Sequence, residues 1–330
     1  MLLDTLKKVL QVYGPTGRED NVAKCVAEML QGKVDSIRTD VMGNLIVEKK
    51  GQENGKTIMF SAHMDHIGLV VTDIEDDGYL RVTNVGGVSV AMSKTRHVVF
   101  HNGVEGVVVC QPTKGETETL AHLFVDIGAE DKADALTKVQ LGDTCVYAPD
   151  CFMLGEHRVA SPAMDDRCAV ALLAELLCEI ENPVNTIVGV FSTQEEVGLR
   201  GANVAAFSVA PDLGVGIDVT GWGDTPEVKL PAVKLGKGAA VKFMDRSMIA
   251  TPMVRDALIA AAEKAGAAYQ REVLPYGGTD GAAIQHSRCG VPAGTLSIPC
   301  RYVHSACEVI DMRDMESALA ILKTFVNMAF

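Results

Sequence analysis

Apolar residues recur every three or four positions close to the amino terminus, which is the spacing of the buried face of an α-helix. This pattern predicts helices over residues 2–14 and 19–32, each ending at a glycine. Alternating and continuous apolar runs then predict strands over residues 36–50, with a turn inside the segment, and over residues 56–63. The first part of the chain is therefore predicted to contribute two helices and the first strands of a sheet.

The pattern changes after Gly68. Between residues 69 and 155 the chain consists of short runs rich in Val, Ile and Thr, broken by Gly, Asn and Asp, and such runs predict strands. A short helix near residues 130–139 is the exception. We therefore expect residues 69–155 to form a small β-rich domain inserted into the chain.

From residue 156 onward, helical and strand patterns alternate again. Helices are predicted over residues 166–180, 251–266 and 311–330, and strands over residues 185–193, 212–220 and 293–299. Alternation of this kind is typical of an α/β sheet with covered faces. Residues 1–68 and 156–330 are accordingly predicted to form one α/β domain around the insert.

Composition narrows the classes of function. The formal net charge of -13 argues against binding to nucleic acids and to anionic membrane surfaces, because both require a basic face. The chain has no run of about 18 apolar residues, so we expect no membrane span, and charged residues interrupt the apolar run that a secretory signal requires. The nine cysteines are scattered without a CxxC pair, which predicts reduced thiols and a cytoplasmic location.

Acidic and histidine side chains collect where the predicted strands end, and open α/β sheets bind ligands at these ends. The stretch SAHMDHIG follows the apolar run TIMF at 57–60 and places two imidazoles and a carboxylate within residues 63–66. The residues at the strand ends are His63, Asp65, His66, Glu195, Glu196, Asp218 and His304, and Asp165 and Asp166 stand at the start of a predicted helix. We expect these side chains to meet at one edge of the sheet.

Each of these residues has an ordinary structural explanation when it is taken alone. A histidine at a strand end is more often structural than a ligand, two adjacent glutamates suit a solvated turn, and acids at a helix start stabilise the helix dipole. Taken together, two histidines and several carboxylates suit a pair of divalent cations such as zinc or cobalt. Two-metal hydrolysis needs a bridging carboxylate, a water and a base that is not a ligand, and this set can supply the protein groups.

In this order along the chain, the motifs HMD, MDDR, STQEEVGLRGA, GIDVT, YGGTDGAAI and PCRYVHSACEVID resemble the M42-type metallo-aminopeptidases. This group includes glutamyl, deblocking and tetrahedral aminopeptidases and proteins once labelled cellulase M. The resemblance covers nearly the whole chain. It implies a mixed-sheet zinc-peptidase catalytic domain of the phosphorylase/hydrolase-like type, with the insert forming a barrel-like or PDZ-like β domain. It also implies a homo-oligomer in which the insert supports assembly, with a tetrahedral dodecamer as the first expectation.

The resemblance implies a role for each residue of the set. It makes Glu195 the general base and Asp65 the acid that orients the imidazole of His63. It makes His63 and Asp218 ligands of one metal, Glu196 and His304 ligands of the other, and Asp165 the bridging carboxylate, with a cis peptide bond to Asp166. Zinc and cobalt both suit such ligands, so the native metal stays open.

Four further residues are assigned less directly. The family usually carries an acid where this chain has His66, so we expect His66 to be structural or peripheral rather than a ligand. Gly277, Gly278 and Asp280 belong to the motif YGGTDGAAI and are candidates for substrate binding, because glycines permit close approach of the backbone to a ligand. An ordinary turn explains the two glycines equally well.

The implied function is the removal of N-terminal residues from short peptides by a water activated at two metals. A related two-metal amidohydrolase or deacylase acting on small amides is the alternative. Glycoside hydrolysis fits less well, since most glycosidases use two carboxyl groups without a metal. A binding or assembly protein without activity is disfavoured because all apparent ligands and the base are present together. The preferred N-terminal residue is not predicted.

Overall fold

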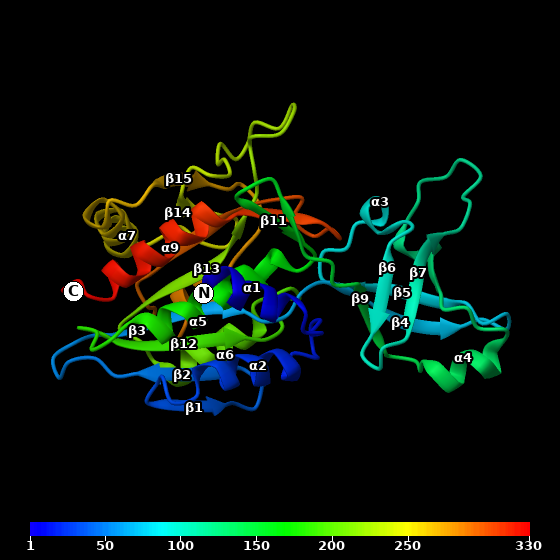
Figure 1. Ribbon diagram of the computed structural model, residues 1–330, viewed down its shortest axis with the longest axis horizontal. Helices are drawn as coiled ribbons and strands as arrows, with labels where there is room; N and C mark the ends of the chain where they lie inside the picture. Colours follow the sequence, from blue (N-terminus) through cyan, green and yellow to red (C-terminus); the bar gives the residue numbers. More distant parts are fainter.

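Eleven strands form one mixed sheet in the structure, a computed structural model that describes residues 1–330 (Figure 1). These strands are β1 (Ser36–Thr39), β2 (Leu45–Lys49), β3 (Thr57–His63), β10 (Phe152–Leu154), β11 (Arg158–Ser161), β12 (Thr186–Ser192), β13 (Leu213–Thr220), β14 (Ala239–Met244), β15 (Tyr269–Val273), β16 (Ala293–Arg301) and β17 (Glu308–Asp311). Their order is β1-β2-β12-β3-β13-β16-β17-β11-β10, and β14 and β15 extend the sheet from β16. The central strands β12, β3, β13 and β16 are parallel neighbours, so their carboxyl ends lie at one edge.

The other strands close into an antiparallel barrel, seen on the right of Figure 1. They are β4 (Gly68–Ile74), β5 (Leu80–Val85), β6 (His97–Phe100), β7 (Glu105–Cys110), β8 (Leu123–Asp126) and β9 (Thr144–Tyr147), in the order β4-β5-β8-β7-β6-β9. The barrel packs its own core of 15 buried residues, whereas 48 form the main core beside the sheet. The mixed sheet and the barrel confirm the predicted fold class, while the predicted limits of the insert, 69 and 155, stay a prediction.

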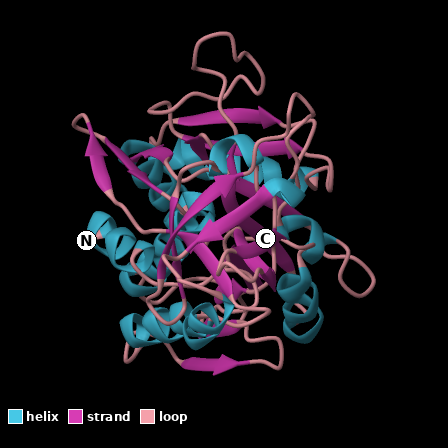
Figure 2. Ribbon diagram, turned by 90° about the vertical axis from the view of Figure 1, so that its right-hand side faces the viewer, coloured by secondary structure: helices cyan, strands magenta, loops and turns pink.

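Helices surround the sheet (Figure 2). They are α1 (Leu2–Leu10), α2 (Asp20–Leu30), α5 (Met164–Glu179), α6 (Arg200–Val209), α7 (Pro252–Ala265), α8 (Asp280–Gln285) and α9 (Met312–Phe325), with α3 (Val90–Ser93) and α4 (Lys132–Lys138) beside the barrel. The main core joins α1, α2, α5, α7 and α9 to the sheet, and a smaller cluster joins α6 and α8 to it. None of these helices has the length and apolar character needed to cross a bilayer.

The first helix is shorter than predicted because of a buried arginine. The guanidinium of Arg167 donates to the main-chain oxygens of Val9, Val12, Gly14 and Met64. The helix therefore ends at Leu10 instead of Gly14, since the carbonyls beyond it bond to Arg167 rather than to a further helical turn. The same contacts fix the amino-terminal segment against α5 and against the end of β3.

Other predicted elements also differ from the structure. The last helix ends at Phe325 instead of residue 330, because the side-chain amide of Asn185 binds the carbonyls of Val326 and Met328. The insert holds α3 and a short 3-10 helix (Leu120–His122) besides the expected α4. Helices α6 and α8 and strands β10, β11, β14, β15 and β17 were not predicted. Most are only three to six residues long, and β11 and β14 pair with strands far away in the sequence.

Candidate active site

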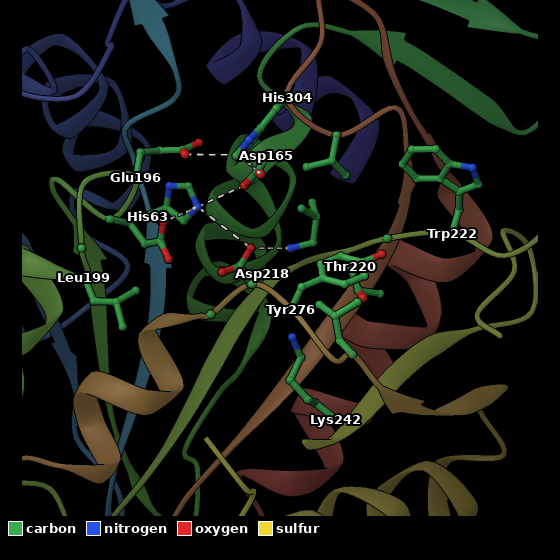
Figure 3. A pocket seen from close by; sticks show the side chains of 18 residues that line it. His63, Asp165, Glu196, Leu199, Asp218, Thr220, Trp222, Lys242, Tyr276 and His304 are labelled. Carbon is green, nitrogen blue, oxygen red and sulfur yellow. Dashed lines mark hydrogen bonds and ion pairs between the residues drawn. The ribbon is translucent and has the colours of Figure 1, made fainter. Parts of the chain in front are cut away.

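A cavity of about 600 Å³ opens at the carboxyl ends of the central parallel strands. Figure 3 shows the side chains that point into it. The predicted site residues that line it are His63, Asp165, Glu195, Glu196, Asp218, Gly277, Gly278 and His304. The structure therefore brings together residues that the sequence distributes over most of its length.

Strand pairing places these side chains beside one another. His63 ends β3 in register with the end of β12, so the turn after β12 carries Glu195 and Glu196 close to the imidazole. Asp218 lies near the end of β13, which is the neighbour of β3 on its other side. Asp165 stands in the first turn of α5, and this helix packs against β3 and β13. Four separate elements thus supply five of the side chains in this site.

The imidazole of His63 faces three carboxylates. Its Nε2 lies 3.1 Å from Asp165 Oδ1, 3.9 Å from Glu195 Oε2 and 4.0 Å from Asp218 Oδ1. Its Nδ1 donates to the main-chain oxygen of Asp65 at 2.9 Å. Because a carbonyl can only accept, this bond leaves Nε2 of the neutral imidazole as the atom whose lone pair faces the carboxylates.

His304 repeats this arrangement on the other side of Asp165. Its Nε2 lies 3.3 Å from Asp165 Oδ2 and 3.2 Å from Glu196 Oε2. The two oxygens of one carboxylate, that of Asp165, therefore face two different imidazoles. The peptide bond between Asp165 and Asp166 is cis, which confirms the expectation from the resemblance.

The site carries more negative charge than its two imidazoles balance. Burial raises the pKa of Glu195 and of Asp218 well above the ordinary range, because desolvation penalises their charged forms. Burial opposes protonation of the imidazoles, but the neighbouring carboxylates outweigh it. They raise the pKa of His63 well above its ordinary value and that of His304 to about 12. A site that attracts protons in this way also favours cations.

Two of the three groups of side chains with a geometry that suits a metal ion contain a histidine. The donor atoms of His63, Glu195 and Asp218, and those of Asp165, Glu196 and His304, lie within 4.8 Å of one another in each group. Two ligand atoms on one tetrahedral zinc, each about 2.0–2.2 Å from it, would lie about 3.3–3.6 Å apart, close to the separations found here. The Oε1 atom of Glu196 is buried without a hydrogen-bond partner. The donor set therefore fits divalent cations.

The carboxylate of Asp65 has a position that the sequence predicts only in part. It lies 3.6 Å from Nδ1 of His63, whereas the direct hydrogen bond of Nδ1 goes to the main-chain oxygen of Asp65 at 2.9 Å, so the orienting role of this carboxylate stays a prediction. Its oxygens also accept the main-chain N–H of Glu195 at 3.0 Å, that of Glu196 at 3.2 Å, and the hydroxyl of Thr16 at 2.7 Å. Asp65 thus also fixes the turn that carries both glutamates.

Besides Asp65, two further predicted residues lie outside the cavity wall. His66 is buried beside a second cavity between α1 and the barrel, and burial, aided by Arg167, lowers its pKa to about 3. Asp280 is buried below the site, where its carboxylate accepts the hydroxyls of Ser61 and Ser192. His66 therefore lies outside the cavity, and Asp280 has a supporting position.

Four further residues complete the cavity. Thr220, Lys242 and Tyr276 were not among the predicted site residues, whereas for Trp222, the only tryptophan, the sequence predicts core packing ahead of a place in the pocket wall. Thr220, Trp222, Lys242 and Tyr276 line the cavity beyond the carboxylates (Figure 3). Thr220 and Trp222 follow Asp218 closely in the sequence, and this closeness is the one signal that could have indicated them. Lys242 comes from β14, a strand that was not predicted.

Comparison with known proteins agrees with this geometry. A model of the M42 glutamyl aminopeptidase family matches residues 43–321. A lysyl aminopeptidase of Pyrococcus furiosus is 33% identical over 98% of this chain and 96% of its own length. The structure of an aminopeptidase from the archaeon Desulfurococcus kamchatkensis superposes with a TM-score of 0.95, at 37% identity, over 99% of this chain and 95% of that one.

A further solved structure is that of the TET1 peptidase of Pyrococcus horikoshii, which can assemble into a tetrahedron or a large octahedral shell. It has a TM-score of 0.90 at 31% identity and covers 100% of both chains. The family match spans most of the sequence, and the similarities extend over the full length of the relatives. The chain therefore belongs to the M42 glutamyl aminopeptidase family.

Proposed function

We propose that this aminopeptidase removes the N-terminal residues of short peptides with the aid of two divalent cations. The observation that carries this proposal is the position of Asp165, whose two carboxylate oxygens face the Nε2 atoms of two different histidines at 3.1 and 3.3 Å. A carboxylate in this position can contribute one oxygen to each of two cations.

The ligand set divides around Asp165. His63 and Asp218 hold one ion, Glu196 and His304 hold the other, and Asp165 is shared. Zinc and cobalt are the ions that suit these nitrogen and oxygen donors best. When bound, such ions lower the pKa of water towards about 7 and polarise the carbonyl of the scissile bond.

Glu195 is left as the general base. Its carboxylate lines the cavity 3.9 Å from Nε2 of His63, and its main chain is anchored by Asp65. Burial raises the pKa of Glu195 above the ordinary range. A raised pKa suits a general base, which works best when its pKa lies near the working pH. Glu195 accepts one proton from the attacking water and returns it to the amine that leaves when the peptide bond breaks.

The remainder of the cavity provides room for the first side chain of the peptide. Gly277 has a φ of 72°, and a Cβ on Gly278 would come within 3.0 Å of the Ser247 hydroxyl. Both positions therefore favour glycine, and both line the cavity, which supports their assignment to substrate binding. Asp280 is a weaker candidate, since it lies below the wall.

Chelation tests the proposal directly. Treatment with a chelator should lower the hydrolysis of aminoacyl-p-nitroanilides by about 100-fold or more, and zinc or cobalt should restore it, because the ions activate the water. The measurement uses a panel of free and N-terminally blocked substrates, each assayed before chelation, after it and after metal addition. Activity that survives complete metal removal would contradict the proposal, and cleavage of the blocked substrates would favour the deacylase alternative.

We also propose that the chain assembles into a tetrahedral dodecamer, with the predicted insert of residues 69–155 supporting assembly. The full-length similarity to a TET1 peptidase supports this. The edge strand β10 also exposes three neighbouring apolar side chains, Phe152, Met153 and Leu154. Light scattering during gel filtration should give about 420 kDa for twelve chains of 35.1 kDa. A monomer at micromolar concentration would contradict the assembly without affecting the proposed chemistry.

A further inference from the structure

Glu308 joins the main chains of two site residues. It is the first residue of β17 and is only 2% exposed. Its Oε2 accepts the N–H of Asp165 at 3.0 Å, and its Oε1 accepts the N–H of His304 at 2.6 Å. One buried side chain thus links α5 to the loop between β16 and β17.

Both of the linked segments have unusual backbone conformations. His304 has a φ of 62° and Tyr302 a φ of 60°, and Ala163, two residues before Asp165, has a φ of 63°. Residues with a Cβ are unfavourable in this left-handed region and persist there only when surrounding contacts hold them. Bonds from a main-chain N–H to a carboxylate are among the stronger hydrogen bonds available for this purpose.

We propose that Glu308 is a positioning residue, which holds Asp165 and His304 at the separation needed to bind one cation between them. The proposal rests on the metal binding proposed above. Its reason is geometric: Asp165 Oδ2 and Nε2 of His304 are 3.3 Å apart, and the same carboxylate fixes the backbone on both sides of this gap. Glu308 itself does not line the cavity, so it acts through these two residues.

Asp65 provides a parallel on the opposite side of the site. Its carboxylate accepts the main-chain N–H groups of Glu195 and Glu196. Two buried acids, Asp65 and Glu308, therefore anchor the backbones of four site residues. The sequence indicated Asp65 through its closeness to His63, whereas Glu308 gave no signal of its own, because its partners are defined only by the fold.

Binding both main-chain N–H groups requires the two acceptor oxygens and the length of the Glu308 side chain. In Glu308→Gln one oxygen can still accept an N–H, but the other is replaced by an NH₂ group that would face the second N–H donor. In Glu308→Asp the carboxyl group remains, but the side chain is shorter by one methylene and cannot span both amides. Either change should release one of the two segments while leaving all proposed ligands in the chain.

The test is a calorimetric titration of the metal-free protein with Zn²⁺, made with wild type, Glu308→Gln and Glu308→Asp. We expect two ions to bind wild type, and the Kd of one of them to rise about 10- to 100-fold in both variants, the usual effect of removing a contact that orients a ligand. The visible absorption spectrum of Co²⁺ bound at the weakened site should also change in both variants. The other ion should be less affected.

Asp314→Asn is the matched control, because Asp314 is also a buried carboxylate that accepts two main-chain N–H groups, from Gly236 at 2.7 Å and Gly238 at 2.6 Å, away from the cavity. It should lower Tm as Glu308→Gln does but leave both Kd values unchanged. The inference about Glu308 would be wrong if the folded Glu308 variants kept the wild-type Kd values, or if Asp314→Asn lost as much affinity as they do. Either result would leave the proposed function standing. A wild type that binds no ion would instead overturn the proposed function.

Discussion

Glu195→Gln is expected to lower kcat by a factor of about 100 to 10,000, the range that a positioned general base contributes. The amide has the size of the carboxylate but cannot take a proton from water. The main-chain N–H of residue 195 would still bond to Asp65, so the turn and its neighbour Glu196 should keep their places. The loss should therefore fall on kcat, with a smaller change in KM.

The metal content of Glu195→Gln shows whether the loss of kcat comes from a missing base or from a missing metal ligand. The donor atom of Glu195 lies within reach of those of His63 and Asp218, so a ligand role is the competing explanation. Glu195→Gln should retain two ions per chain if it is the base, and should lose one if it is a ligand. Glu175→Gln is the control: Glu175 is a buried glutamate of α5 that bonds to Thr5 and does not line the cavity, and its variant should keep kcat within about twofold.

The convergence of the site could be predicted because it follows from a rule about sheets. Parallel strands place their carboxyl ends at one edge, so side chains after β3, β12 and β13 had to meet if those strands were parallel neighbours. The apolar runs of these strands are continuous and buried, which made them visible in the sequence. The roles within the set came from the family resemblance.

The supporting contacts could not be predicted because they leave no local pattern. Asp65 bonds to the backbone of Glu195 and Glu196, and Glu308 to that of Asp165 and His304. A main-chain N–H is present at almost every residue, so the sequence does not show which of them a distant carboxylate will meet. The early end of α1 was not predicted for the same reason. The guanidinium of Arg167 donates to carbonyl groups that lie far from it in the chain.

Asp165→Asn is expected to lower kcat/KM by about 1,000-fold or more, because the binding of both activating ions is weakened and their positions change. An asparagine side chain has one oxygen and one NH₂ group. It can therefore offer an oxygen to the ion beside one imidazole, but not to the ion beside the other. In the present structure the two oxygens of Asp165 lie 3.1 and 3.3 Å from Nε2 of His63 and of His304. Both ions should therefore bind more weakly in this variant.

The comparison with His304→Ala separates a shared ligand from a private one. His304→Ala removes a ligand of one ion only, so it should reduce the metal content from two ions to one and leave the Kd of the other within about threefold. Asp165→Asn should raise both Kd values by about 10-fold or more, measured by the same titration. If both variants bind one ion with wild-type affinity, Asp165 serves a single ion. The two imidazoles would then belong to sites that do not share a carboxylate, and the proposed two-metal arrangement would be wrong.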